Sequence, residues 1–409
     1  MLKDQFNNKI NINDSKIIDS LNKFESNFLG YKKNTQEIFK LSKNYENFLP
    51  FQLHSALISI FIDNLEGFNS AKKYIIKAKK LIDKKQATDR DINYYNFLNN
   101  LLKKKFFQAL TYLDILINNN HDDLFFAKIG QIFYFSIGDN KKMINLANLV
   151  IKNNKKNPYA LSMLSFALEE YNQIDKAKEV ALKGLSINQS DPWSHHTLAH
   201  IFEVENKPEK GIDTLKSLSH YWNDCNSFIY THNWWHIALF YLKINDLDNA
   251  LKIFNKHLWD SPNSDKSYSQ DQAGAVSLLI RLKLKNKNIE RHWKKVSSEI
   301  IKRKIFFSDP FIATHYAYVI GSVDNLKLKT KFQENIELLE NSKNEYDKKI
   351  WKKAGVPLCK AMINHAEKNY KSSYRYFNES INHWSLIGGS HTQRDLFKIL
   401  FDESKKKNN

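Results

Sequence analysis

The sequence predicts an all-α fold made of repeated helix-turn-helix units. Only 11 glycines and 7 prolines occur among 409 residues, too few for the many tight turns of a sandwich or barrel. Apolar residues recur at steps of three and four along most of the chain, which is the spacing of one helix face. A period of 34 residues, marked by small side chains at three of its four positions, identifies the helices as members of a repeat.

An N-terminal helical cap is expected over residues 1–45. The first twenty or so residues are polar, and we expect them to be frayed. Beyond them, apolar side chains at Leu21, Phe24 and Phe28, and again from Ile38, have the spacing of two amphipathic helices.

A repeat array is expected over residues 46–260. It is marked by four residues at intervals of 34: Ala109, Met143, Ala177 and Gly211. Small side chains also stand twelve residues before the last two, at Ser165 and Ala199. Two helices approach closely only where small side chains meet, so the twelve-residue step marks a hairpin. This period and step predict a tetratricopeptide-like superhelical solenoid.

The repeat changes after its fourth marker. From Gly211 to Ala250 the step is 39, so about five extra residues lie before or around the THNWWH stretch.

Residues 261–409 are expected to form C-terminal helical repeats that close the solenoid, after a linker at 261–275. Ser390 and Gln393 have capping-box spacing and predict a final helix beginning at Ser390. The lysine-rich tail after Ser404 is expected to be disordered.

Composition limits the classes of partner and compartment. The net charge of +18 is spread over single lysines and short runs, a pattern typical of solvated helix faces, so no specific nucleic-acid partner is expected. No apolar run is long enough to span a membrane, and no secretion signal opens the chain. With only two cysteines and no disulfide framework, a cytoplasmic location is expected.

Residues 191–236 carry most of the unusual side chains. Steps of three, four and three place four of them on one helix face: Trp193, His196, His200 and Glu203. The next unit offers four more within five residues: His232, Asn233, Trp235 and His236. The first helix of a tetratricopeptide hairpin lines the concave surface, so these side chains are expected to converge in one pocket. His195, one residue off this face, is expected to pack or to lie on the surface.

The leading hypothesis for this pocket is that it binds a peptide, a protein segment or a small ligand. Two histidines four residues apart with a glutamate can also bind a divalent metal or act as an acid-base pair, so the alternative is an enzyme of uncharacterised reaction. Metal-ligand candidates are His196, His200, Glu203, His232 and His236. The HExxH signature of zinc proteases is absent. Structural packing between neutral imidazoles and indoles remains a further interpretation.

Other candidate ligand-binding residues lie farther along the sequence. His54 falls in an early hairpin, and Glu169 occupies the concave face of its unit. The helix bearing His315 and the pair Arg394 and Asp395 can fold back toward the pocket, although a local salt bridge is the simpler interpretation of that pair.

Five motifs in matching order resemble the tetratricopeptide repeat protein 38 family. They are FALEE (166–170), DPWSHHTLAHIFEVE (191–205), HNWWHIAL (232–239), VPLCKAM (356–362) and GGSHTQRDLF (388–397). The resemblance runs from about Leu21 to Phe397.

The resemblance implies degenerate tetratricopeptide units, with the family's motif histidines at His196, His200, His232 and His236 and its glutamate at Glu203. It implies no reaction, because the family has none established. Where the family leads us to expect aspartates, this chain has Gly274 and Ala313, so a site using those carboxylates would be altered here.

Overall fold

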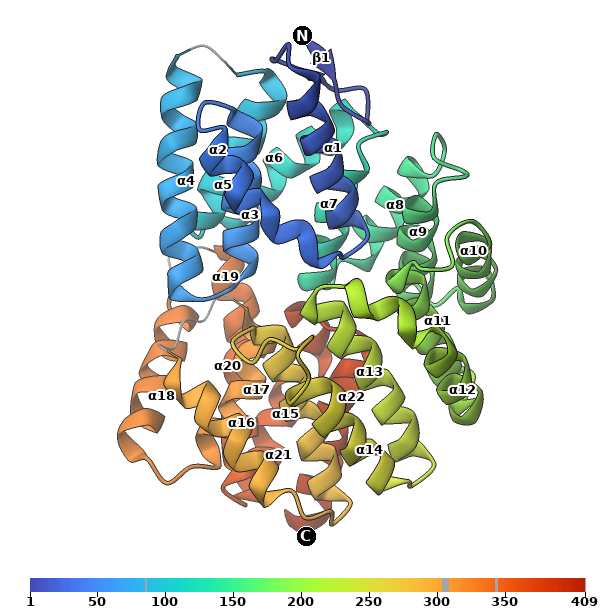
Figure 1. The fold of residues 1–409 in the computed structure, drawn as a ribbon. Helices are drawn as coiled ribbons and strands as arrows, with labels where there is room; N and C mark the ends of the chain where they lie inside the picture. The colour runs from blue at the N-terminus through green and yellow to red at the C-terminus, as the bar shows by residue number, and fades with distance from the viewer. Residues whose placement is uncertain (85–86, 304–308, 343–344, 409) are drawn as a thin grey trace. The chain divides into compact units, whose positions relative to one another are not determined.

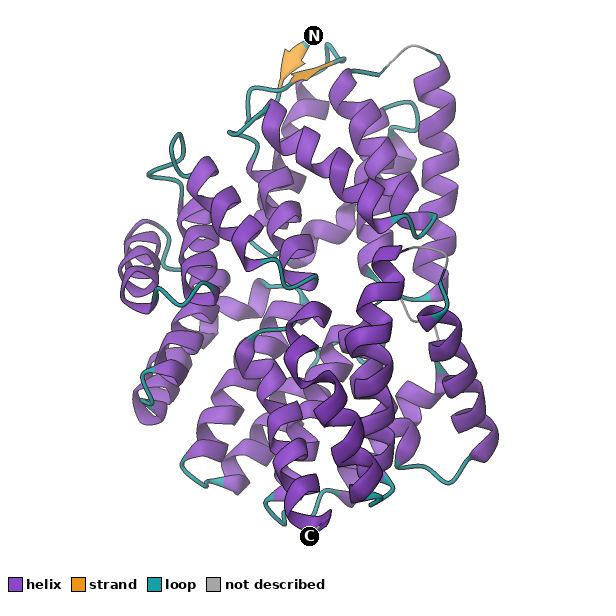
Figure 2. Ribbon diagram, turned by 180° about the vertical axis from the view of Figure 1, so that it is seen from behind, coloured by secondary structure: helices purple, strands orange, loops and turns teal. Residues whose placement is uncertain are grey.

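The computed structural model describes residues 1–84, 87–303, 309–342 and 345–408 (Figure 1). Within these ranges loops connect helices, and the only named strands are one antiparallel pair of two residues each, β1 (Leu2–Lys3) and β2 (Lys9–Ile10) (Figure 2). The predicted all-α class is therefore confirmed. Among the described helices, none is both long enough and apolar enough for a membrane span.

Contacts within the chain divide it into two compact units. Unit 1 comprises Met1–Tyr134, Asn140–Ile201 and Thr214–Asn233, and unit 2 comprises Phe135–Asp139, Phe202–Asp213 and Trp234–Asn409. The N-terminal cap (1–45), the repeat array (46–260) and the C-terminal repeats (261–409) expected from the sequence are consecutive segments of the chain. This three-part division stays a prediction.

Most helices follow one another as antiparallel pairs. The helices up to the middle of the chain are α1 (Ser15–Leu29), α2 (Ile38–Asn44), α3 (Leu49–Phe61), α4 (Leu65–Asp83), α5 (Asp89–Leu102), α6 (Phe106–Asn119), α7 (Leu124–Ser136), α8 (Asn140–Val150), α9 (Pro158–Glu170), α10 (Ile174–Ile187), α11 (Pro192–Val204), α12 (Pro208–Leu218) and α13 (Ser227–Lys243). Within unit 1, α3 packs on α4, α5 on α6 and α9 on α10.

The remaining helices belong to unit 2. They are α14 (Leu247–Ile253), α15 (Ser269–Leu284), α16 (Glu290–Lys302), α17 (Pro310–Gly321), α18 (Leu326–Glu340), α19 (Glu345–Ile350), α20 (Val356–Ala366), α21 (Tyr370–Ser380) and α22 (His391–Asn408). Among them α20 packs on α17 and α21, and α21 packs on α22.

The 34-residue period is clearer in the hairpin turns than in the helices. The four hairpins from α5–α6 to α11–α12 each have a turn residue with positive φ, again at intervals of 34: Lys104, Gly138, Asn172 and Asn206. A left-handed residue after a helix satisfies the last backbone carbonyls, and glycine and asparagine adopt it most readily. The next such turn, at Asn245, comes 39 residues later. The short 3₁₀ segment η2 (Ser219–Asp224) occupies the insertion.

The marker residues lie at buried helix crossings. Ala109, Met143 and Ala177 are fully buried on the second helices of their pairs, and the degenerate first-helix positions Phe97 and Gln131 are buried as well. The twelve-residue step therefore holds even where the side chains are not small.

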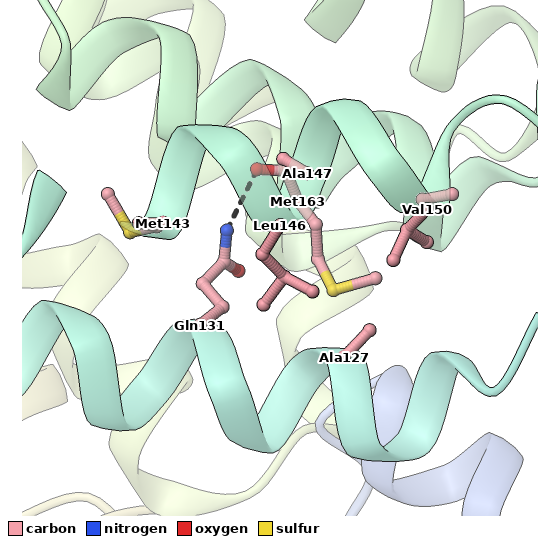
Figure 3. A pocket seen from close by; sticks show the side chains of 8 residues that line it. Ala127, Gln131, Met143, Leu146, Ala147, Val150 and Met163 are labelled. Atoms are coloured by element: carbon pink, nitrogen blue, oxygen red, sulfur yellow. Dashed lines mark hydrogen bonds between the residues drawn. The ribbon is translucent and has the colours of Figure 1, made fainter. Parts of the chain in front are cut away.

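Side chains fill the crossing of α7, α8 and α9 almost completely (Figure 3). About 10 Å³ of space remains among Ala127, Gln131, Met163 and their neighbours, the lower limit for one water molecule. The side-chain amide of Gln131 donates to the backbone carbonyl of Met163 at 2.8 Å. This crossing is a packed core and has no room for a ligand.

Both ends of the chain are more ordered than expected. The N-terminal segment is not frayed, because the Asp4 carboxylate accepts hydrogen bonds from Asn8, whose amide also donates to Asp123 at 2.8 Å. At the other end, α22 begins after the predicted Ser390 cap but continues to Asn408, so the expectation of a disordered tail is wrong. The predicted linker is shorter than expected, because α15 begins at Ser269.

Candidate metal centre

The N-terminus of α11 fixes the position of the first two histidines. The buried carboxylate of Asp191 accepts hydrogen bonds at Oδ2 from the backbone N–H of Ser194 at 3.0 Å and from its hydroxyl at 2.7 Å. Pro192 takes a first-turn position, where its missing N–H leaves no helix bond unmade. From this start the side chains at 193, 196 and 200 point to one face of the helix.

Three imidazoles from two helices of unit 1 meet through their Nε2 atoms. His196 and His200 lie one turn apart on α11, and His232 lies on α13. Nε2 of His196 is 3.0 Å from Nε2 of His200 and also 3.0 Å from Nε2 of His232. His196 and His200 are buried, and His232 is half-buried.

A carboxylate on α9 sets the orientation of one of these rings. Oε2 of Glu169 is 3.1 Å from Nδ1 of His200, and the Glu169 side chain is fully buried. A carboxylate accepts, so Nδ1 of His200 donates and the neutral ring presents a lone pair at Nε2. Oε1 of Glu170 lies 4.0 Å from the same Nδ1.

Aromatic rings enclose the three imidazoles. Trp193 stacks on His196 with centroids 4.6 Å apart, Phe166 lies 5.4 Å from His196, and Phe228 stacks on His232 at 5.5 Å. Burial, and to a lesser degree the neighbouring His200, lowers the pKa of His232 to about 3. At neutral pH this ring is therefore uncharged, which is the form that coordinates metals.

His195 has a different role, in agreement with the prediction that it packs. Its Nδ1 accepts a hydrogen bond from the indole N–H of Trp222 at 2.9 Å, so its Nε2 donates to the carbonyl of Gln189 at 2.9 Å. Trp222 belongs to the inserted segment η2. The Nδ1 bond thus holds the insertion against α11, and the Nε2 bond ties the ring to the segment that precedes α11.

A buried lysine, not predicted from the sequence, lies beside this site. Lys128 on α7 is 2% exposed, and its Nζ lies 4.0 Å from the ring centre of Trp193 and 4.8 Å from that of Tyr31. Nζ donates to Oε1 of Gln131 at 3.2 Å. Burial lowers the pKa of Lys128 to about 7, against the opposing charge of Asp191.

Two other predicted residues of unit 1 have partners of their own. The amide of Asn233 donates to the carbonyl of Pro192 at 3.2 Å and so ties α13 to the start of α11. His54 lies in a separate cluster, where its Nδ1 is 3.2 Å from the Tyr94 hydroxyl and its Nε2 is 3.9 Å from Glu25. Burial lowers the pKa of His54 well below its ordinary value.

Three candidates from the motif region belong to unit 2. His236 is buried on α13, one turn beyond His232, and its ring meets Trp235 edge to face at 5.0 Å. The backbone carbonyl of Glu203 accepts a hydrogen bond from Lys243 at 3.2 Å. Participation of these residues in a site stays a prediction.

The C-terminal candidates also lie in unit 2. Nδ1 of His315 donates to the carbonyl of Phe311 at 2.9 Å, and burial lowers the pKa of His315 to about 4. Arg394 donates to the carbonyls of Gly388 and Gly389, the two left-handed residues that precede α22. The charge of Asp395 acts on a further arginine, Arg281, which the sequence did not single out.

Comparison with known proteins supports the repeat class. No family model matches the chain. The chain is 28% identical, over 217 residues, to a TPR repeat-containing protein from Methanocaldococcus jannaschii; the match covers 50% of this chain and 37% of that relative. The chain thus spans little more than a third of the length of the relative that it matches. The similarity and the 34-residue spacing of the turns together support a tetratricopeptide-repeat protein.

Proposed function

We propose that unit 1 binds a divalent transition metal through His196, His200 and His232. The observation that carries this proposal is the approach of three Nε2 atoms, with His196 Nε2 at 3.0 Å from each of the other two. Zinc binds imidazole nitrogen at about 2.0–2.1 Å, so two ligands on one ion lie roughly 2.9 Å apart at right angles and roughly 3.3 Å apart in a tetrahedron. The observed spacing lies within this range.

Hydrogen bonds between the rings account less well for this geometry. A ring nitrogen either carries a proton and donates or carries a lone pair and accepts. Nδ1 of His200 donates its hydrogen bond to Glu169, so in the neutral ring Nε2 carries the lone pair. Nε2 of His196 carries at most one proton, so it cannot donate a full hydrogen bond to His200 and another to His232 at the same time. An ion at the centre satisfies all three lone pairs.

The surroundings resemble those of other histidine-metal sites. A ligating histidine commonly donates its second N–H to a carboxylate, which fixes the ring and strengthens the ligand, and Glu169 has this relation to His200. Imidazole ligands favour zinc, iron, copper and nickel over calcium or magnesium. Three protein ligands leave a coordination position for water or for an atom of a small ligand. Participation of His236 as a metal ligand stays a prediction from the sequence.

The repeats around the proposed metal site indicate a role in binding other proteins. Tetratricopeptide repeats commonly bind other proteins, and similarity to a TPR repeat-containing protein supports that role in general terms. The burial of Trp193, His196 and His200 favours a metal or small ligand at this position over an extended peptide. Membership of the tetratricopeptide repeat protein 38 family, a cytoplasmic location and the lack of a specific nucleic-acid or membrane partner remain predictions from the sequence.

The test is the metal content of the purified chain and of single variants. We expect about one equivalent of zinc, iron, copper or nickel in the unaltered chain, and a loss of affinity of about 10-fold to 100-fold in Glu169→Gln, which removes only the orienting charge. His196→Ala should retain no metal. His220→Ala, which alters an exposed histidine of the same unit, should retain it in full. A metal-free chain after reconstitution, or full occupancy in His196→Ala, contradicts the proposal.

A further inference from the structure

Unit 1 has a groove that lies apart from its histidines. The groove holds about 470 Å³, and apolar side chains of α9 and α10 line it: Leu164, Leu168 and Val180. Phe166, which contacts His196, stands two residues from each leucine and therefore points to the opposite face of α9. The groove thus lies on the side of α9 that faces away from the candidate metal centre.

Three consecutive helices form this groove. α8 and α10 both pack on α9 (Figure 1). Leu164 and Leu168 stand one turn apart on α9 and form the base of the groove with their edges, being 8% and 7% exposed. Val180 on α10 is half-buried, and Ile187, two turns farther along the same face, is 48% exposed. Apolar surface therefore continues along the groove at helical spacing.

Lysines border this groove on both sides. Lys176 lines it on α10, and Lys183 lies two turns farther on the same helix face. Across the groove, Lys141 shares the face of α8 that carries Asn148, and Lys152 follows the end of α8. All four lysines are exposed, and none forms an ion pair within the described parts of the chain. These four lysines are the rim of the groove.

Acids near the groove are fewer than lysines. Glu179 lines it, and Asp175 lies one turn before Glu179 on α10. Residues 140–168, which supply α8 and most of α9, contain five lysines and no aspartate or glutamate. The groove therefore has an apolar base and a positive rim, and a partner with apolar and acidic side chains complements both.

We propose that this groove binds an acidic amphipathic helix of another protein. Apolar residues at every third or fourth position of that helix would contact Leu164, Leu168 and Val180, and its carboxylates would lie beside the lysines of the rim. A second copy of this chain is a worse fit, because its net charge of +18 makes two copies repel each other. A nucleic acid would pair with the lysines but would leave the apolar base without a partner.

The experiment is fluorescence anisotropy with a labelled peptide of about 18 residues, which has leucine at every third or fourth position and glutamate at the others. We expect saturable binding of about one peptide per chain. The same peptide with lysine in place of glutamate should not bind. The peptide with alanine in place of leucine should bind at least about tenfold more weakly. An equal concentration of duplex DNA should not displace the glutamate peptide.

Variants of the chain locate the binding. Val180→Glu places a negative charge in the groove and should weaken binding by at least about tenfold. Lys152→Glu combined with Lys176→Glu neutralises the rim and should weaken it by at least about tenfold as well. The matched control is Lys72→Glu combined with Lys73→Glu, which makes the same change of charge at exposed positions on α4. This control should bind within about twofold of the unaltered chain.

Four results overturn the proposal: no saturable binding, equal binding of the lysine peptide, displacement of the glutamate peptide by DNA, or an equal loss of affinity in the two double variants. If Val180→Glu lacks the helical circular dichroism of the unaltered chain, the double variants decide. Binding of the peptide should be unchanged in His196→Ala, so the outcome is independent of the histidine site in unit 1.

Discussion

Replacing Lys128 with methionine should stabilise unit 1 at neutral pH. Methionine has a similar length and can pack its thioether against Tyr31 and Trp193, but it carries no charge into the core. The pKa of Lys128 falls from 10.5 to about 7 on folding. Each pH unit between these values corresponds to about 1.4 kcal/mol of stability, so burial of the ammonium costs at most about 5 kcal/mol below pH 7.

Proton binding decides whether the stability of the protein rises or falls with pH. Between pH 7 and pH 10.5 the unfolded chain holds the lysine proton and the folded chain does not, so the stability of the unaltered protein rises with pH. The variant also leaves Oε1 of Gln131 without its donor, at a cost of about 1 kcal/mol. Lys128→Met should therefore be more stable by about 3 kcal/mol at pH 7, and this advantage should vanish by about pH 10.

The assay is urea unfolding from pH 7 to pH 10, read by hydrogen exchange in peptides from α7. Lys183→Met, at an exposed position on α10, is the control and should show no difference that varies with pH. A variant that is less stable than the unaltered chain at pH 7, or a difference that is constant with pH, would refute the reasoning. Either result would mean that the charge of Asp191 offsets the full free-energy cost of burying the Lys128 ammonium.

Two further variants test the packing of each unit. Arg90→Met removes the cation 3.6 Å from buried Glu25 and should cost about 3–5 kcal/mol at pH 7 in urea unfolding. The cost should shrink at pH 5, because the raised pKa of Glu25 lets that carboxyl bind a proton; equal costs at both pH values would contradict this account. In unit 2, Gly211→Ala places a Cβ 2.5 Å from the Phe240 ring and should lower stability by about 1–3 kcal/mol, whereas Gly274→Ala should change it by less than about 0.5 kcal/mol in the same assay.

Much of the fold was predictable because the repeat leaves a local mark in the sequence. Close helix crossings favour small side chains, so Ala177 marks its unit without any knowledge of its partners. The segment before α1 leaves no such mark. Asp4 and Asn8 order it through polar contacts with a residue more than a hundred positions away, and no periodicity reports such contacts.

The candidate site was predictable only in part for the same reason. The spacing of His196 and His200 places them on one face, and the repeat places His232 on the next hairpin. Spacing does not say what lies opposite a helix face, so it could not show that His54 lies with Tyr94 in another cluster. Lys128 was not foreseen because its burial depends on rings from two other segments.

Anomalous X-ray scattering from crystals of the metal-loaded chain tests the central claim most directly. Data collected above and below the absorption edge of the metal found by elemental analysis should place one peak at about 2.0–2.2 Å from the Nε2 atoms of His196, His200 and His232. Glu169 should remain hydrogen-bonded to His200 without touching the ion. A peak elsewhere, or none in crystals soaked with excess metal, would contradict the account.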